Sequence, residues 1–226
     1  MKTKYIATVS GLIAMGLLWM VPAKANMIYT MTDGNSAISG YTGPYGTVTV
    51  NLTDSTHATV TFSGASVGGY QFLFGGAQGV DVNVNASSWS IGSFTETKIG
   101  TGFAAGDWAS GGFQNAVDGH GSFNQTVDNV DGFAHAAGQV SFILTDLGGI
   151  WASEADVLLA NADGYSVDAH IFVTPNTVDQ ANGALATGYA GDGGGVRVPD
   201  GGSTALLMGI AGTAVGCISR RLRAVR

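Results

Sequence analysis

The 226-residue chain carries 16 Asp and Glu against nine Lys and Arg, and its one cysteine is Cys217. Every carboxylate lies between Asp33 and Asp200, where Lys98 and Arg197 are the only Lys or Arg, so this stretch has a net charge of about −14. A surface this acidic repels phosphates and excludes a nucleic-acid partner. A single cysteine, placed in the apolar C-terminal stretch, excludes a disulfide framework and a cysteine metal site in the body.

The first 25 residues have the pattern of a secretory signal peptide. Two lysines precede an almost entirely apolar run, residues 6–21, and Ala23 and Ala25 form a small-x-small cleavage site before Asn26. We expect the secretion machinery to recognise residues 1–25 and the mature chain to begin at Asn26. The alternative is a retained membrane anchor.

The body, residues 26–187, is dominated by period-two alternation of apolar and polar residues, which is typical of half-buried β-strands. Clusters of Gly, Asn, Asp and Ser separate the alternating segments and predict hairpins and short loops. Only residues 152–160 have a helical pattern. The expected fold class is therefore all-β: an antiparallel two-sheet sandwich, jelly-roll-like, rather than a closed barrel. The predicted strands cover residues 47–53, 58–62, 80–84, 140–144 and 167–173.

The histidines are the first candidates for metal ligands. Asp118 lies two residues before His120, and Asp168 two residues before His170, a spacing that places carboxylate and imidazole on the same strand face. No His-x-His or His-Glu-x-x-His pattern occurs, so the sequence favours solvated histidines. The remaining two are His57 and His135.

Calcium is the one metal for which the sequence offers ligands, and no other cofactor is expected. Residues 128–132 and 161–164 each place carboxylate or amide oxygens beside a turn-forming glycine, although neither fits the EF-hand spacing. Ordinary Asx turns are the alternative. The candidate ligands are Asp128, Asp131 and Asp163.

No pattern predicts catalysis, and the chain is expected not to be an enzyme. A Gly-x-Ser-x-Gly elbow is absent, and carboxylates that could serve glycoside hydrolysis cannot be paired from sequence. Three tryptophans would form a sugar-stacking platform if they were exposed on one face, although a sandwich core also needs large aromatics. These carboxylates are Asp118, Asp128, Asp131 and Glu154, and the tryptophans are Trp89, Trp108 and Trp151.

Residues 188–197 are rich in glycine and predict a flexible linker. A three-part segment, 198–226, follows: a motif at 198–204, an apolar stretch at 205–219 and an arginine-rich tail at 220–226. The apolar stretch is expected to be a transmembrane helix, although fifteen residues span only about 22 Å of a hydrocarbon core of about 30 Å. The arginines orient it with the body outside and the tail inside. The motif begins Val198, Pro199, Asp200, Gly201, Gly202, and the arginines are Arg220, Arg221, Arg223 and Arg226.

This C-terminus resembles the PEP-CTERM sorting signal, in the variant class with a VPDSG or VPDGG motif. The resemblance implies an exosortase-like enzyme that cuts near Pro199, a single-pass precursor held transiently in the inner membrane, and delivery to the cell surface or extracellular matrix. Stretches 41–50, 131–135 and 169–173 are also similar to bodies of uncharacterised PEP-CTERM proteins, which implies no known activity.

The expected function is that of a non-catalytic surface or matrix component associated with exopolysaccharide or biofilm matrix. The alternative is a secreted carbohydrate-binding module or carbohydrate-active hydrolase. For the C-terminal segment the alternative is a plain tail anchor, and which processing enzyme acts stays open because the motif departs from the Pro-Glu-Pro form.

Overall fold

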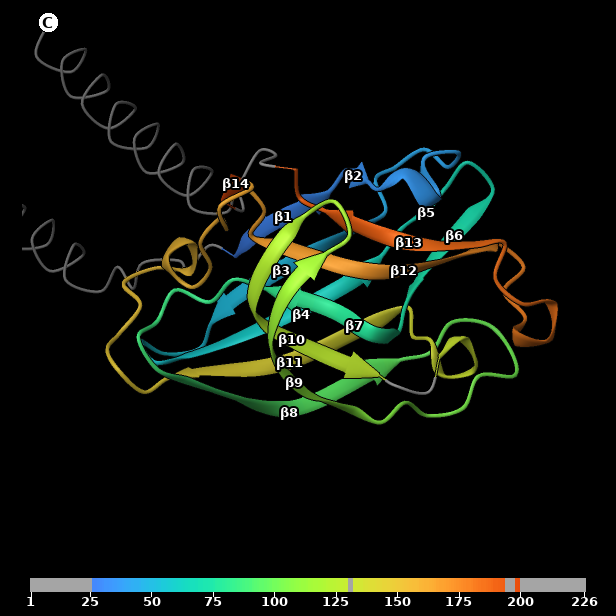
Figure 1. Cartoon of the computed structure of the whole chain (residues 1–226). Coiled ribbons are helices and arrows are strands. Elements are labelled where there is room, and N and C mark those ends of the chain that lie inside the picture. The colour runs from blue at the N-terminus through green and yellow to red at the C-terminus, as the bar shows by residue number, and fades with distance from the viewer. Residues whose placement is uncertain (1–25, 130–131, 194–197, 200–226) are drawn as a thin grey trace, which may run out of the picture. The chain divides into compact units, whose positions relative to one another are not determined.

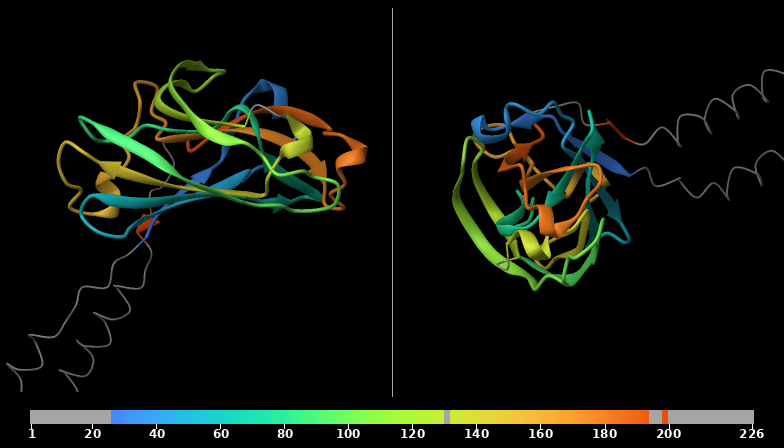
Figure 2. Two further views of the ribbon diagram at one scale, coloured as in Figure 1. Left: turned by 90° about the horizontal axis from the view of Figure 1, so that it is seen from below. Right: turned by 90° about the vertical axis from the view of Figure 1, so that its right-hand side faces the viewer.

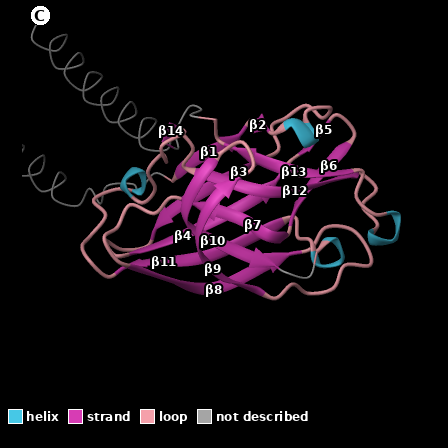
Figure 3. Cartoon of the chain, viewed as in Figure 1, coloured by secondary structure: helices cyan, strands magenta, loops and turns pink. Residues whose placement is uncertain are grey.

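The computed structural model describes residues 26–129, 132–193 and 198–199, which belong to one compact unit, Asn26–Asp200. Strands and loops account for nearly all of these residues (Figure 3). The strands form antiparallel sheets in two facing layers (Figures 1 and 2). The all-β, antiparallel fold predicted from sequence is therefore confirmed, and the layers are consistent with a β-sandwich.

Sheet A has the strand order β14-β1-β3-β4-β11-β8. Its central strands alternate buried and less buried residues, as a strand with one face in the core must. The strands are β14 (Val198–Pro199), β1 (Met27–Met31), β3 (Gly46–Leu52), β4 (His57–Gly64), β11 (Gln139–Asp146) and β8 (Trp89–Thr97).

Sheet B has the order β2-β13-β12-β7-β10-β9, and β6 pairs with β12 and with the short β5. The β9–β10 hairpin curves over the outer face of this sheet (Figure 2). The strands are β2 (Asp33–Gly34), β13 (Ala186–Gly191), β12 (Val167–Pro175), β7 (Gly76–Val82), β10 (Gly121–Asn129), β9 (Trp108–Val117), β6 (Tyr70–Phe74) and β5 (Ser66–Val67).

The core lies between the two sheets and is made of the apolar residues that the alternation pattern marks. Sheet A contributes Val50 and Phe62, while sheet B contributes Val82, Val127 and Ile171, all fully buried. Burial of such side chains is the main favourable term in folding. The five segments predicted as strands are confirmed as β3, β4, β7, β11 and β12.

The helix predicted at residues 152–160 is wrong. Only Glu154–Asp156 forms a single 3₁₀ turn, and the chain then runs extended beside the segment after β7. Leu158 forms a bridge with Val84, and the amide of Asn85 donates to the carbonyl of Val157 at 2.9 Å. Val157 and Leu158 are both fully buried, so packing overrides a weak local helical preference.

The flexible linker was predicted to start at residue 188, and this predicted start is too early. Residues 188–191 belong to β13 and pair with β12, where Ile171 is opposite Gly188 and Asp168 is opposite Gly191. A Cβ at Gly191 would lie 2.6 Å from Cδ1 of Tyr165. The glycine is therefore needed for close packing and not for flexibility.

Candidate functional site

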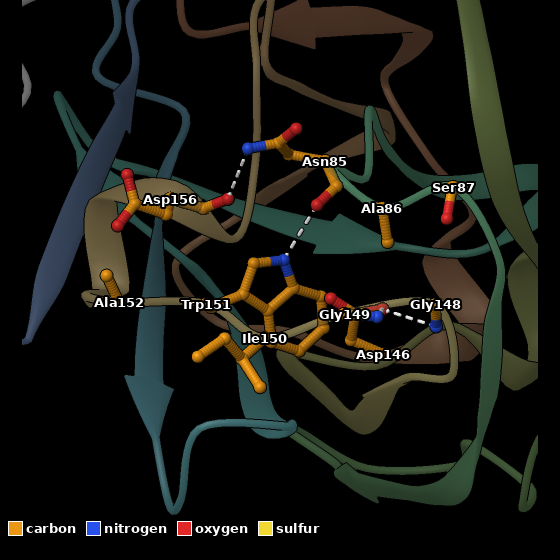
Figure 4. Close-up of a pocket in the computed structure, with 10 residues that line it drawn as sticks. All are labelled: Asn85, Ala86, Ser87, Asp146, Gly148, Gly149, Ile150, Trp151, Ala152 and Asp156. Atoms are coloured by element: carbon orange, nitrogen blue, oxygen red, sulfur yellow. Dashed lines mark hydrogen bonds between the residues drawn. The ribbon is translucent and has the colours of Figure 1, made fainter.

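An open pocket of about 470 Å³ lies at one end of the sandwich (Figure 4). Its wall is built from three segments: the residues after β7, the end of β11 with the loop that follows it, and the 3₁₀ turn. The volume falls in the range of about 300–1,000 Å³ typical of small-molecule sites. The lining residues are Asn85, Ala86, Ser87, Asp146, Gly148, Gly149, Ile150, Trp151, Ala152 and Asp156.

Hydrogen bonds to the backbone hold the inner wall of the pocket in place. Trp151 is only 2% exposed, and its Nε1 donates to the carbonyl of Asn85 at 2.8 Å. The side-chain amide of Asn85 donates in turn to the carbonyl of Asp156 at 2.7 Å. These two bonds join the three segments of the wall (Figure 4). The pocket is therefore preformed, which lowers the entropic cost of binding.

Two carboxylates lie on the wall, and both already accept hydrogen bonds from the protein. Asp146 Oδ1 accepts from the amides of Gly148 and Gly149 at 2.8 and 2.9 Å. Asp156 Oδ2 accepts from the hydroxyl of Ser153 at 2.8 Å. The lining holds no Lys, Arg or His. The pocket therefore suits a neutral or cationic ligand with many hydroxyl or amino groups and disfavours an anion.

Trp108 and Trp151 take the core role that a sandwich has for large aromatics, so the three tryptophans do not form the alternative sugar-stacking platform. Trp108 is 8% exposed and Trp151 is 2% exposed, and both belong to the hydrophobic core. Trp89 packs against that core, and its Nε1 donates to Oε1 of Gln125 at 3.1 Å. Trp108 and Trp151 are therefore too buried to stack on a sugar, while Trp89 is only partly buried.

A buried histidine links the tip of the β9–β10 hairpin to β12, in the same sheet. Nδ1 of His120, at the hairpin tip, is bonded to Oδ2 of Asp168 on β12, and neither side chain is more than 3% exposed. Burial lowers the pKa of His120, while Asp33, Asp118 and Asp192 act in the opposite direction. The prediction of a solvated histidine is therefore wrong at this position.

The two aspartate–histidine spacings do not produce the pairs that the sequence suggested. Asp118 accepts from the side-chain amide of Asn35 at 3.0 Å instead of orienting His120. His170 bonds to the carbonyl of Gly75 at 2.6 Å and to Oγ1 of Thr187 at 2.7 Å. The carboxylate near each histidine in sequence thus has another partner in the fold.

The remaining two histidines, His57 and His135, also have hydrogen-bond partners. Nδ1 of His57, the first residue of β4, contacts Asp54 at 3.0 Å. Nδ1 of His135 is bonded to the carbonyl of Ala105. Among the described residues, no three His, Cys, Asp or Glu side chains group as ligands of a metal ion.

The three candidate calcium ligands do not form one site. Asp128 lies near the end of β10, and its Oδ1 accepts from the amide of Gln78 at 2.7 Å. Asp163 lies beside Gly121, at the start of the same strand, and Asp131 lies outside the described residues. Around Asp163 the loop is an ordinary Asx turn, because Oδ1 of Asn161 accepts from the amides of Asp163 and Tyr165 at 3.0 Å.

Of the carboxylates weighed for glycoside hydrolysis, Asp118, Asp128 and Glu154 do not line the pocket, and Asp131 lies outside the described residues. The pocket carboxylates Asp146 and Asp156 were not among the residues predicted from sequence. The signal available for Asp146 was the following Leu-Gly-Gly turn, which directs two amides to one carboxylate.

Only the first two residues of the predicted processing motif are described. Val198 and Pro199 form β14 and pair with Ile28 and Met27 of β1. The predicted cleavage residues Ala23 and Ala25, the rest of the motif, the apolar stretch and the arginines lie outside the described residues. Within the part of the chain that the structure describes, no helix is long and apolar enough to cross a membrane.

Comparisons with known proteins give no relative for this chain: no family model, no curated protein and no solved structure matches it.

Proposed function

We propose that the chain is an exported, non-catalytic component of the cell surface or extracellular matrix, sorted by its C-terminal segment. The secretion machinery removes residues 1–25, the inner membrane holds residues 205–219 as a helix, and an exosortase-like enzyme cuts near Pro199. The signal segment is helical. The exported body is a jelly-roll-like sandwich that associates with extracellular polysaccharide.

The observation that carries the proposal is the agreement between the two ends of the sequence. A signal-peptide pattern places the body outside the inner membrane, and the arginines after residue 219 demand the same orientation. The first two residues of the motif, Val198 and Pro199, also lie next to the folded body, since β14 pairs with the first residues of β1. A net charge of about −14 keeps such a body soluble and well separated from other acidic surfaces.

Intact mass of the protein isolated from its native host tests the proposal. We expect a chain that begins at Asn26 and lacks Arg220–Arg226. A surface form that retains the arginines contradicts sorting and leaves a plain tail anchor. A form that retains residues 1–25 contradicts the signal peptide.

A second candidate function is saccharide binding, which the pocket at the end of the sandwich favours. Its wall combines carboxylate, amide, hydroxyl and main-chain groups without a cation, so neutral and amino sugars suit it better than uronic acids. Tryptophan fluorescence of the purified chain, titrated with glucose, glucosamine and glucuronate oligomers, measures this. Ala152→Trp fills the exposed side of the pocket and should abolish binding. Leu185→Trp, another exposed position and not part of the lining, is the matched control.

A further inference from the structure

The only described lysine lies where the edge of sheet A meets sheet B. Lys98 follows β8, and its Nζ is 3.1 Å from Oε2 of Glu96 on the same strand. Nζ also donates to the carbonyl of His135 at 3.1 Å. Asn129, the last residue of β10, donates from Nδ2 to this same carbonyl at 2.9 Å. The amine of Lys98, which follows a strand of sheet A, and the carboxamide of Asn129, in sheet B, thus donate to the same carbonyl oxygen.

The surroundings of this group are largely shielded from water. Asn129 is fully buried, and its Oδ1 has no hydrogen-bond partner among the described residues. The side chains of Lys98 and Glu96 are 25% and 17% exposed. Trp108 covers the carboxylate and donates from Nε1 to Glu96 Oε2 at 2.7 Å.

Gly106 allows the close approach of these groups. Its amide donates to Oε1 of Glu96 at 3.0 Å. A Cβ at this position would lie 2.5 Å from Nδ2 of Asn129 and 2.8 Å from Nε1 of Trp108. The carboxylate of Glu96 is therefore held by three donors, the Gly106 amide, the Trp108 indole and the Lys98 amine, beside the carboxamide of Asn129.

We propose that Lys98 and Asn129 become joined by an intramolecular isopeptide bond, with Glu96 as the proton carrier. Nζ gives one proton to Glu96 and becomes a nucleophile, because only an unprotonated amine attacks a carbonyl carbon. Nζ then bonds to Cγ of Asn129 and the Cγ–Nδ2 bond breaks. Glu96 returns a proton to the leaving nitrogen and takes one from Nζ. Glu96 then passes this second proton to the released ammonia and is a carboxylate again. One ammonium ion therefore leaves for each amide formed, and atoms and charge balance without an oxidant or a cofactor.

The bond would connect the end of β8 in sheet A to the end of β10 in sheet B. Small exported proteins commonly use disulfides for such cross-links, but no cysteine lies between Asn26 and Arg197. This bond modifies the body alone, and its formation does not depend on how the chain is sorted.

Mass spectrometry and trypsin together test the bond in the full chain. The linked protein should be lighter than its sequence by one ammonia, about 17 Da. Lys98 is the only trypsin site between Lys24 and Arg197, and an acylated lysine is not cleaved. We therefore expect the denatured chain to yield one uncut fragment across this stretch. A full mass together with cleavage after Lys98 overturns the proposal.

Four variants separate the bond from other sources of the mass loss. Asn129→Ala should restore cleavage after Lys98, whereas Asn182→Ala, at an exposed position, should not. Lys98→Arg should have the full mass; a loss of ammonia that persists in this variant assigns it to another asparagine and overturns the bond. Glu96→Gln should fold, as circular dichroism will report, and remain unlinked. A linked Glu96→Gln chain overturns the role of Glu96 as proton carrier.

Discussion

Asp81 on β7 and Asp168 on β12 lie directly opposite each other on antiparallel strands, and both side chains are fully buried. They point to the outer face of sheet B, because their neighbours Val80, Val82 and Ala169 point into the core. Like charges directly opposite on paired strands destabilise a sheet.

Burial, followed by the charges of neighbouring aspartates, raises the pKa of both carboxyls well above the ordinary value of 3.8. For Asp81 the neighbours are Asp168 and Asp128, while a hydrogen bond from Thr126 acts in the opposite direction. For Asp168 the neighbouring charges are those of Asp192 and Asp33, and a hydrogen bond from the backbone amide of Ala169 acts in the opposite direction. The folded protein therefore holds protons that the unfolded chain releases above pH 3.8.

We predict that the free energy of unfolding falls as the pH rises from 3.8 through the raised folded-state pKa values, because the folded state binds more protons there. Asp81→Asn removes the ionisable group and keeps its shape. It should stabilise the protein at pH 8 and less at pH 5. The gain comes from the proton that the unchanged chain must take up at Asp81 on folding, and it grows by up to about 1.4 kcal/mol for each pH unit above 3.8. Urea unfolding at both pH values and constant ionic strength measures this. Asp107→Asn, at an exposed loop position, is the control, and an equal gain at both pH values contradicts the prediction.

Loss of the His120 side chain should loosen the hairpin tip. His120→Ala leaves Asp168 buried without its partner, at a cost of about 1–3 kcal/mol, and removes the ring that contacts Tyr165 at a centroid distance of 4.5 Å. Hydrogen exchange should accelerate at the tip, where the amide of His120 donates to Val117. Adding Asp168→Asn to His120→Ala should cost less than the two single changes together. His57→Ala, at the start of β4, should leave exchange at the tip unchanged, and strict additivity would argue against a direct bond.

Period-two alternation was sufficient to predict β3, β4, β7, β11 and β12, since their apolar residues all face one core. It missed β9 and β10, whose glycines and register shifts interrupt the alternation. The pairing of His120 with Asp168 joins residues 48 positions apart, so no local spacing could indicate it. The pocket likewise joins three segments that meet only when the sandwich closes.

Two strand glycines should respond in opposite directions to the same substitution. A Cβ at Gly64, on β4, would collide with the carbonyl oxygen of Phe72, so Gly64→Ala should destabilise the protein by about 1–3 kcal/mol through overpacking. At Gly92, on β8, a Cβ would meet nothing within 4 Å. Gly92→Ala should therefore stabilise by about 0.4–1 kcal/mol, because it restricts the unfolded chain. Thermal unfolding of both variants measures the difference. A similar loss in both would show that strand propensity, and not the contact with Phe72, decides the effect.

Salt should stabilise the protein through screening, without preference for calcium. Aspartates and glutamates far outnumber cations in the body, and their mutual repulsion destabilises the compact state. At 0.1 M salt, screening limits the range of that repulsion to about 10 Å. Asp128 instead binds the Gln78 amide, and the loop around Asp163 is closed by Asn161. Neither loop, as described, gathers the six or more oxygen ligands that calcium takes.

We therefore expect thermal unfolding of the full chain to give the same midpoint in Na⁺, Mg²⁺ and Ca²⁺ at matched ionic strength. A calcium site specific to the folded state would behave differently, because it adds stability by mass action, about 2.7 kcal/mol at a hundredfold excess over Kd. An extra increase that occurs with Ca²⁺ alone and saturates would contradict the expectation and restore the calcium hypothesis. Asp128→Asn and Asp163→Asn would then locate the ion, since only the variant at the occupied loop loses the increase.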